Sequence, residues 1–154
     1  MPTYRINLAY DGTGFHGYAR QNGLRTVQGE FETALFHRTG EVATAVAGRT
    51  DAGVHAVGQV ISFSVATSLD TATLQRSLNS QLGPEIAVYG VSEVPDTFHA
   101  RFSATGRRYR YRIWNAPVHD PLSVRTTWHV CEPLDVAAME RAVGALVGTR
   151  DFAS

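Results

Sequence analysis

The chain has 154 residues, 44% of them hydrophobic, which suits one domain with a core of its own. Its one cysteine, Cys131, excludes an internal disulfide bond, and six singly scattered histidines offer no metal-ligand spacing. No segment has the length and hydrophobicity of a signal peptide or a membrane span, so we expect a soluble, cytoplasmic protein with no membrane partner.

The formal net charge is zero, from 14 basic and 14 acidic residues, but the basic residues are unevenly distributed. All of them are arginines, and the range 97–119 contains five arginines and no acidic residue. A guanidinium group binds phosphate oxygens through a fork of donors and stacks on bases. This range therefore indicates an anionic partner, although the average charge does not.

The N-terminal part is predicted to form a strand, a loop and a helix. Residues 4–10 alternate in polarity, as a half-buried strand does. The segment that follows, residues 11–17, contains a formal G-x-G-x-x-G. We reject a dinucleotide site, because its last glycine does not open a helix, and expect the glycines to shape a surface loop. The helix should begin after Thr26, since apolar residues recur every four positions at Val27, Phe31 and Leu35.

Two further strands, a helix and a fourth strand complete this pattern. Strands are predicted over 42–47 and 60–65, a helix capped by Asp70 carries the stripe Leu74, Leu78 and Leu82, and a strand covers 86–94. The order β-α-β-β-α-β indicates an α+β, ferredoxin-like fold. In this fold a mainly antiparallel sheet carries both helices on one face.

The connection between the second and third strands, residues 47–56, concentrates reactive groups. Hairpins usually turn in about two to five residues, so this longer loop suggests another task. Gly48 and Gly53 flank Asp51, and in an extended backbone Arg49 would point to the same face as Asp51. We identify Asp51 as the candidate catalytic residue. An ordinary acidic turn is the alternative interpretation.

Residues 96–154 are predicted to form an extension to the ferredoxin-like subdomain of residues 1–95. A strand over 107–114 places Tyr109 and Tyr111 on one face and three arginines on the other. A half-buried strand with solvated arginines is the alternative. Three like charges on one face favour an anion, which is either a phosphate backbone or acidic groups elsewhere in the full protein. A strand near 124–130 and a helix after Asp135 follow, whose buried side should carry Met139, Val143 and Leu146.

Five ordered motifs across the chain resemble those of the tRNA pseudouridine synthase A family. They are Tyr10-Asp11-Gly12-Thr13, Thr26-Val27-Gln28-Gly29, the loop from Gly48 to Ala56, Phe98-His99-Ala100-Arg101-Phe102-Ser103-Ala104 and Arg107-Arg108-Tyr109-Arg110-Tyr111. The resemblance implies isomerisation of uridine to pseudouridine in the anticodon stem-loop of tRNA, at positions 38 to 40. It also implies a homodimer that uses no metal or organic cofactor.

By the same resemblance Asp51 is the essential aspartate, Arg49 its partner, and Tyr109 the tyrosine beside the target base. The reaction breaks the C1'–N1 bond and joins C1' to C5 without net redox change. The carboxylate could stabilise positive charge at the sugar, attack covalently, or remove a sugar proton to give a glycal. Further RNA contacts are expected from Arg20, Gln21, Arg101, Arg107, Arg108, Arg110 and Tyr111.

Two departures from the family pattern bear on these expectations. Gly17-Tyr18-Ala19-Arg20-Gln21 stands where the family shows Gly-Trp-Gln-x-Gln, which puts any RNA contact of the replaced side chains in doubt. The family also has a second, similarly folded half. We therefore expect this chain to be an N-terminal half that turns over poorly alone. The rival function is a non-catalytic module like an RRM, in which tyrosines on a sheet stack on single-stranded RNA.

Overall fold

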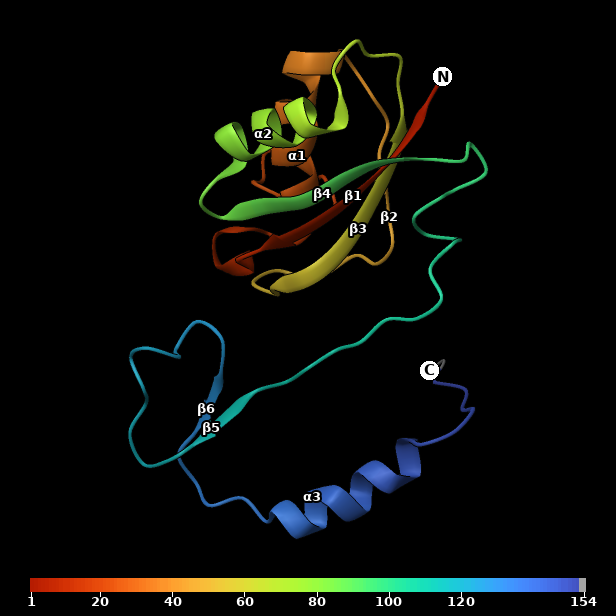
Figure 1. The fold of residues 1–154 in the computed structure, drawn as a ribbon. Coiled ribbons are helices and arrows are strands. Elements are labelled where there is room, and N and C mark those ends of the chain that lie inside the picture. The colour runs from red at the N-terminus through yellow and green to blue at the C-terminus, as the bar shows by residue number, and fades with distance from the viewer. Residues whose placement is uncertain (153–154) are drawn as a thin grey trace. The chain divides into compact units, whose positions relative to one another are not determined.

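The computed structural model describes residues 1–152, and the chain divides into two compact units. The first unit comprises residues 1–108, so residues 96–108 belong with the ferredoxin-like part, and the second begins at Tyr109. Figure 1 shows both units, and each is described by itself below.

The first unit is a four-stranded antiparallel sheet with two helices on one face (Figure 1). Its elements are, in chain order, β1 (Thr3–Tyr10), α1 (Val27–Thr39), β2 (Ala45–Val46), β3 (Ala56–Ser64), α2 (Thr71–Leu82) and β4 (Ile86–Val94). The strands lie in the order β2-β3-β1-β4, and each neighbouring pair is antiparallel. The predicted ferredoxin-like fold is confirmed.

The core lies between the sheet and the helices. Alternate residues of β1 are buried, and Ile6 is opposite Ile61 of β3 in the strand register. The apolar stripes predicted for the two helices are buried against these strands, at Val27, Phe31, Leu35, Leu74, Leu78 and Leu82. The period of four residues therefore identified the core-facing side of both helices.

Both helices of the first unit begin at the predicted caps. The Thr26 side chain accepts a hydrogen bond from the Gly29 N–H, and the Asp70 side chain accepts one from the Thr73 N–H. These bonds satisfy donors that a helix N-terminus otherwise leaves without partners. No helix within residues 1–152 combines the length and hydrophobicity needed to cross a bilayer.

The strands around the Asp51 loop differ from prediction. β2 has only two residues, and β3 begins at Ala56 rather than at residue 60 because Ala56 pairs with Tyr10 at the end of β1. Val57 and Gly58 are exposed and do not show a strand pattern in the sequence, so the pairing is decided by the neighbouring strand. The connecting loop therefore covers residues 47–55.

The second unit contains short elements without a buried core. β5 (Ile113–Asn115) pairs in parallel with β6 (Trp128–Val130), and α3 (Val136–Val143) is capped by Asp135. The predicted strand over 107–114 was wrong before residue 113, because only residues 113–115 have a strand partner among the described residues. The predicted strand near 124–130 is likewise reduced to β6.

The predicted burial of one side of the helix after Asp135 was also wrong; the structure forms α3 to Val143 and a 3-10 helix over Gly144–Leu146. Met139, Val143 and Leu146 are 41%, 56% and 58% exposed, and no hydrophobic side chain between residues 109 and 152 is buried. Two three-residue strands and one eight-residue helix have too little area to enclose a core.

Candidate active site

Asp51 lies near the middle of the loop that joins β2 to β3, and it is exposed. A tight turn follows it, in which the Val54 N–H donates to the Asp51 carbonyl at 3.2 Å. Gly53, the third residue of this turn, occupies the left-handed region with φ of 77°, which glycine adopts without strain. Arg49 is exposed as well, and the ion pairs within residues 1–152 do not join it to Asp51. Their pairing stays a prediction.

The backbone on both sides of Asp51 is held by residues 12–18, the segment that follows β1. The Tyr18 N–H donates to the Thr50 carbonyl at 2.9 Å, and the Gly53 N–H donates to the Phe15 carbonyl at 3.2 Å. Because one bond precedes Asp51 and the other follows it, the carboxylate is presented on a backbone with little freedom.

The first turn of α1 holds the same segment from its other side. The Val27 N–H donates to the Gly17 carbonyl at 3.2 Å, and the Gln28 N–H donates to the Tyr18 carbonyl at 2.9 Å. Donors at a helix N-terminus commonly take such loop carbonyls. The helix, residues 12–18 and the Asp51 loop therefore form one connected backbone arrangement.

Gly12 and Gly17 are buried beneath the Asp51 loop, so the predicted surface loop was wrong at these two positions. A Cβ atom at Gly12 would lie 2.1 Å from the Val54 carbonyl oxygen, and one at Gly17 would lie 3.0 Å from the Thr50 carbonyl oxygen. Gly17 also has φ of 89°, which other residues rarely adopt. Close backbone approach therefore explains both glycines.

Side chains from β1 and β3 support the loop from inside the fold. The Tyr10 hydroxyl is 2.8 Å from the Thr50 Oγ1, and the Gln59 Nε2 donates to the Gly48 carbonyl at 2.7 Å. Gln59 is buried, so its amide contributes where water cannot compete. The sequence identified Tyr10 as a half-buried strand position and as part of a family motif, but gave no signal for Gln59.

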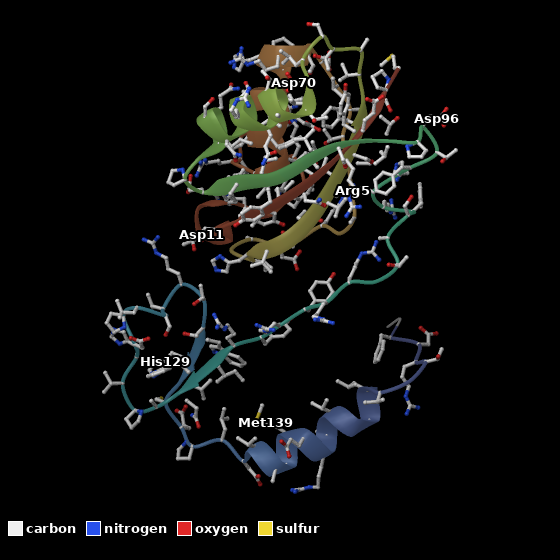
Figure 2. All side chains as sticks on the ribbon, in the orientation of Figure 1. Arg5, Asp11, Asp70, Asp96, His129 and Met139 are labelled. Carbon is white, nitrogen blue, oxygen red and sulfur yellow. The ribbon has the colours of Figure 1, made fainter. Side chains whose placement is uncertain are left out.

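His55, at the end of the loop, contacts the turn after β1. Its Nδ1 accepts a hydrogen bond from the Gly12 N–H at 3.2 Å, and the Asp11 Oδ1 lies 3.1 Å from the same nitrogen. Figure 2 shows Asp11 in this turn. The hydrogen bond from the Gly12 N–H therefore attaches His55, and with it the end of the loop, to the turn after β1.

Tyr18 is a core residue rather than an RNA contact. It is 1% exposed, its ring centroid lies 6.4 Å from that of Tyr10, and burial raises the pKa of its phenol strongly. Its hydroxyl has no hydrogen-bond partner among residues 1–152. Tyr18, which stands at the position of the family's tryptophan, therefore packs in the core beside Tyr10.

The buried Tyr18 hydroxyl, which lacks a hydrogen-bond partner among the described residues, predicts an effect on stability. Tyr18→Phe is expected to raise the free energy of unfolding by about 1 kcal/mol, because a buried group without a partner is removed. Tyr10→Phe is the matched control, and it should lower that free energy by about 1 kcal/mol because it removes a bonded hydroxyl. Urea unfolding of both variants measures the difference, and a destabilised Tyr18→Phe would contradict the assignment.

Arg20 and Gln21, predicted to bind RNA, make contacts within the protein. Arg20 forms an ion pair with Glu32 at 3.2 Å, although its side chain remains 66% exposed, and the Gln21 Nε2 donates to the His16 carbonyl at 2.8 Å. Both residues line a surface cavity of about 320 Å³ beside α1. Their RNA contacts stay a prediction.

A second arginine of this cavity, Arg25, pairs with two carboxylates. Its guanidinium donates to Glu85 at 2.6 Å and to Glu30 at 3.2 Å. The hydrogen bond from Arg25 lowers the pKa of Glu85. Arg20 and Arg25 thus face three carboxylates, those of Glu30, Glu32 and Glu85, so the cavity carries no excess positive charge.

This ion pair predicts a pH dependence of stability. Because the folded protein lowers the pKa of Glu85 below its ordinary value of 4.5, the pair stabilises above that value and is lost as the pH falls through the lowered pKa. We expect Glu85→Gln to show a shallower loss of stability below about pH 4.5 than the parent protein. Thermal unfolding at a series of pH values measures the slopes, and parallel slopes would refute the linkage.

The remaining predicted RNA residues fall in both units. In the first unit, Arg107 binds the Asp51 loop through the Ala47 carbonyl, while the Arg101 guanidinium lies 5.7 Å from the centre of the Phe102 ring. In the second unit, Tyr109 and Tyr111 are 66% and 88% exposed. Both tyrosines lie outside the four-stranded sheet, which disfavours an RRM-like platform. The roles of Tyr109, Arg108, Arg110 and Tyr111 stay predictions.

Comparison with known proteins places this arrangement in a family. Residues 7–103 match the family model described as tRNA pseudouridine synthase. The chain is 47% identical over 157 residues to tRNA pseudouridine synthase A of Geobacillus kaustophilus, covering 99% of this chain and 60% of the relative. It is 44% identical over 156 residues to the Bartonella quintana protein of that name, covering 99% of this chain and 63% of the relative.

The tRNA pseudouridine synthase A of Escherichia coli (strain SE11) is 45% identical over 157 residues, covering all of this chain and 58% of the relative. The chain thus spans about three fifths of the length of these relatives. The family match includes the Asp51 loop, residues 12–18 and both helices of the first unit. This chain belongs to the tRNA pseudouridine synthase family.

Proposed function

We propose that this chain supplies the catalytic aspartate of a tRNA pseudouridine synthase, which isomerises uridine to pseudouridine at positions 38 to 40 of the anticodon stem-loop. The observation that carries the proposal is the setting of Asp51. Its side chain is exposed, while hydrogen bonds to the flanking Thr50 and Gly53 hold the backbone. A carboxylate in this setting is accessible to a nucleotide and already positioned.

The proposed reaction is an isomerisation, in which the uracil changes the ring atom that is bonded to the ribose. The C1'–N1 bond breaks, the uracil turns, C5 bonds to C1', the C5 proton leaves to a base and N1 takes up a proton, so atoms and electrons balance without a redox partner. The Asp51 carboxylate either stabilises the sugar cation, attacks covalently, or removes a sugar proton. The base for the last step is Asp51, water or Tyr109.

Access to the target requires a flipped nucleotide. Extruding a base costs a few kcal/mol, and stacking on an aromatic ring returns about 1 to 3 kcal/mol. The exposed Tyr109 is the proposed stacking residue, and Arg101, Arg108 and Arg110 are proposed phosphate contacts. Arg49 is proposed to pair with Asp51 once RNA is bound. By resemblance to the family, the complete enzyme is proposed to act as a cytoplasmic homodimer.

Release of tritium from uracil C5 of tRNA tests the function. Two proteins are compared: the 154-residue chain, and a chimaera that adds the part of the Geobacillus kaustophilus relative that this chain does not match. We expect release by the chimaera, only from RNA with uridine at the target positions, and slow release by the chain alone. RNA binding by both proteins without any release would favour the RRM-like module and overturn the proposal. Comparable rates from both would refute the expected need for the second half.

A further inference from the structure

Arg107 contacts the Asp51 loop at the point where the loop leaves the sheet. Its Nε donates to the Ala47 carbonyl oxygen at 2.8 Å, and its second donor, Nη2, binds the same oxygen. Ala47 is itself attached to β3, because its N–H donates to the Val60 carbonyl at 2.9 Å. The carbonyl that receives the guanidinium therefore has a defined position.

The two carbonyls that begin the loop are held by side chains of different kinds. The Ala47 carbonyl is bound by exposed Arg107, and the Gly48 carbonyl by buried Gln59. Two residues later the Thr50 carbonyl is bound by the Tyr18 N–H. Three of the four carbonyls from Ala47 to Thr50 thus accept a hydrogen bond in these contacts, and the exception is that of Arg49.

A bond from a charged guanidinium to a carbonyl is stronger than one between neutral groups. Arg107 is also the first residue of the basic run 107–112, and Arg108, the other arginine of this run that belongs to the first unit, forms no hydrogen bond to the loop among the described residues. Its position in the sequence suggests a phosphate contact, whereas its donors are directed at the loop. Arg107 therefore differs from Arg108, the next residue of the motif, in that its guanidinium is bound to the Asp51 loop.

We propose that Arg107 is a positioning residue that holds the Asp51 loop through the Ala47 carbonyl, and that it does not serve as a phosphate contact. The proposal rests on the proposed function for its effect on turnover. The tether itself is a property of the free protein. It predicts that Arg107 acts on kcat through the orientation of Asp51, and that RNA affinity depends on other arginines.

The test compares four variants: Arg107→Ala, Arg107→Lys, Arg108→Ala and Arg76→Ala. Arg76 is an exposed arginine of α2 that donates to Thr73 of the same helix, so its variant controls for loss of one positive charge. Amide hydrogen exchange at Gly53 and Val54 is measured in the 154-residue chain. The salt dependence of binding to an anticodon stem-loop RNA is measured with the same protein, and turnover at saturating RNA with the chimaera.

For Arg107→Ala we expect exchange at these two amides to be about tenfold faster at unchanged global stability, because local opening becomes easier. The kcat should fall about 10- to 100-fold with unchanged KM, because Asp51 is displaced. Arg107→Lys should bring both the amide exchange rates and kcat part of the way back to the parent values, since an ammonium can donate to the same carbonyl. The salt slope should stay at the parent value, whereas Arg108→Ala should reduce it by about 0.7 to 0.9.

The proposal would be overturned by parent-like exchange in Arg107→Ala, or by a salt slope for Arg107→Ala that is reduced as in Arg108→Ala. The second would make Arg107 a phosphate contact. Faster exchange in Arg76→Ala would also overturn it, because the effect would then follow from lost charge alone. If the parent chimaera releases no tritium, the proposed function fails, while the exchange and salt measurements still decide whether Arg107 holds the loop.

Discussion

Asp51→Asn is expected to reduce tritium release from uracil C5 by at least about 10³-fold, because an amide neither stabilises a sugar cation nor acts as a nucleophile or base. The substitution keeps the size of the side chain, and the neighbouring backbone bonds to Thr50 and Gly53 do not involve the carboxylate. Folding and RNA binding should therefore remain close to those of the parent protein. The measurement is single-turnover release by the chimaera.

Asp96→Asn is the matched control, since it also removes one exposed carboxylate. Asp96 lies in the turn after β4, which Figure 2 shows away from Asp11 and hence from the turn that contacts the Asp51 loop. Parent-like release is expected from it. If Asp51→Asn also released tritium at the parent rate, the reaction would have to use another group, and the assignment of Asp51 would fail.

Gly12→Ala is expected to destabilise the protein by about 2 kcal/mol or more, because the new methyl group would overlap backbone that cannot rotate away. Its Cβ would lie 2.1 Å from the Val54 carbonyl oxygen, which belongs to the turn after Asp51. Relief of the overlap must move either the turn or the end of β1. The same substitution should therefore lower kcat by about 100-fold, as a displacement of roughly 1 Å in an active site does.

Gly58→Ala provides the control for this prediction. Gly58 is an exposed glycine of β3, and a Cβ atom there would meet no heavy atom within 4 Å. Urea unfolding and single-turnover release should both remain near the parent values for this variant. Parent-like stability in Gly12→Ala would show that the loop does not lie against Gly12 in solution.

The local sequence was sufficient for the element order of the first unit, for its helix caps and for the presence of the loop that carries Asp51. Thr26 and Asp70 cap their helices through bonds to residues three positions away, and such contacts are visible in a short window of sequence. The loop was recognised because its length exceeds what a hairpin requires. The β5 region shows the limit of this approach, because alternating Tyr and Arg indicate strand propensity but do not provide a partner strand.

By itself, then, the sequence determined the ferredoxin-like order and the motifs of the family, because periodicity, caps and loop length are properties of neighbouring residues. Only the tertiary structure decided that Gly12 and Gly17 support the Asp51 loop, that Tyr18 is buried, and that Arg107 binds Ala47. Ala47 and Arg107 are 60 residues apart in the chain. A long arginine side chain can reach a phosphate or a carbonyl equally well, and the folded backbone determines which acceptor lies within its reach.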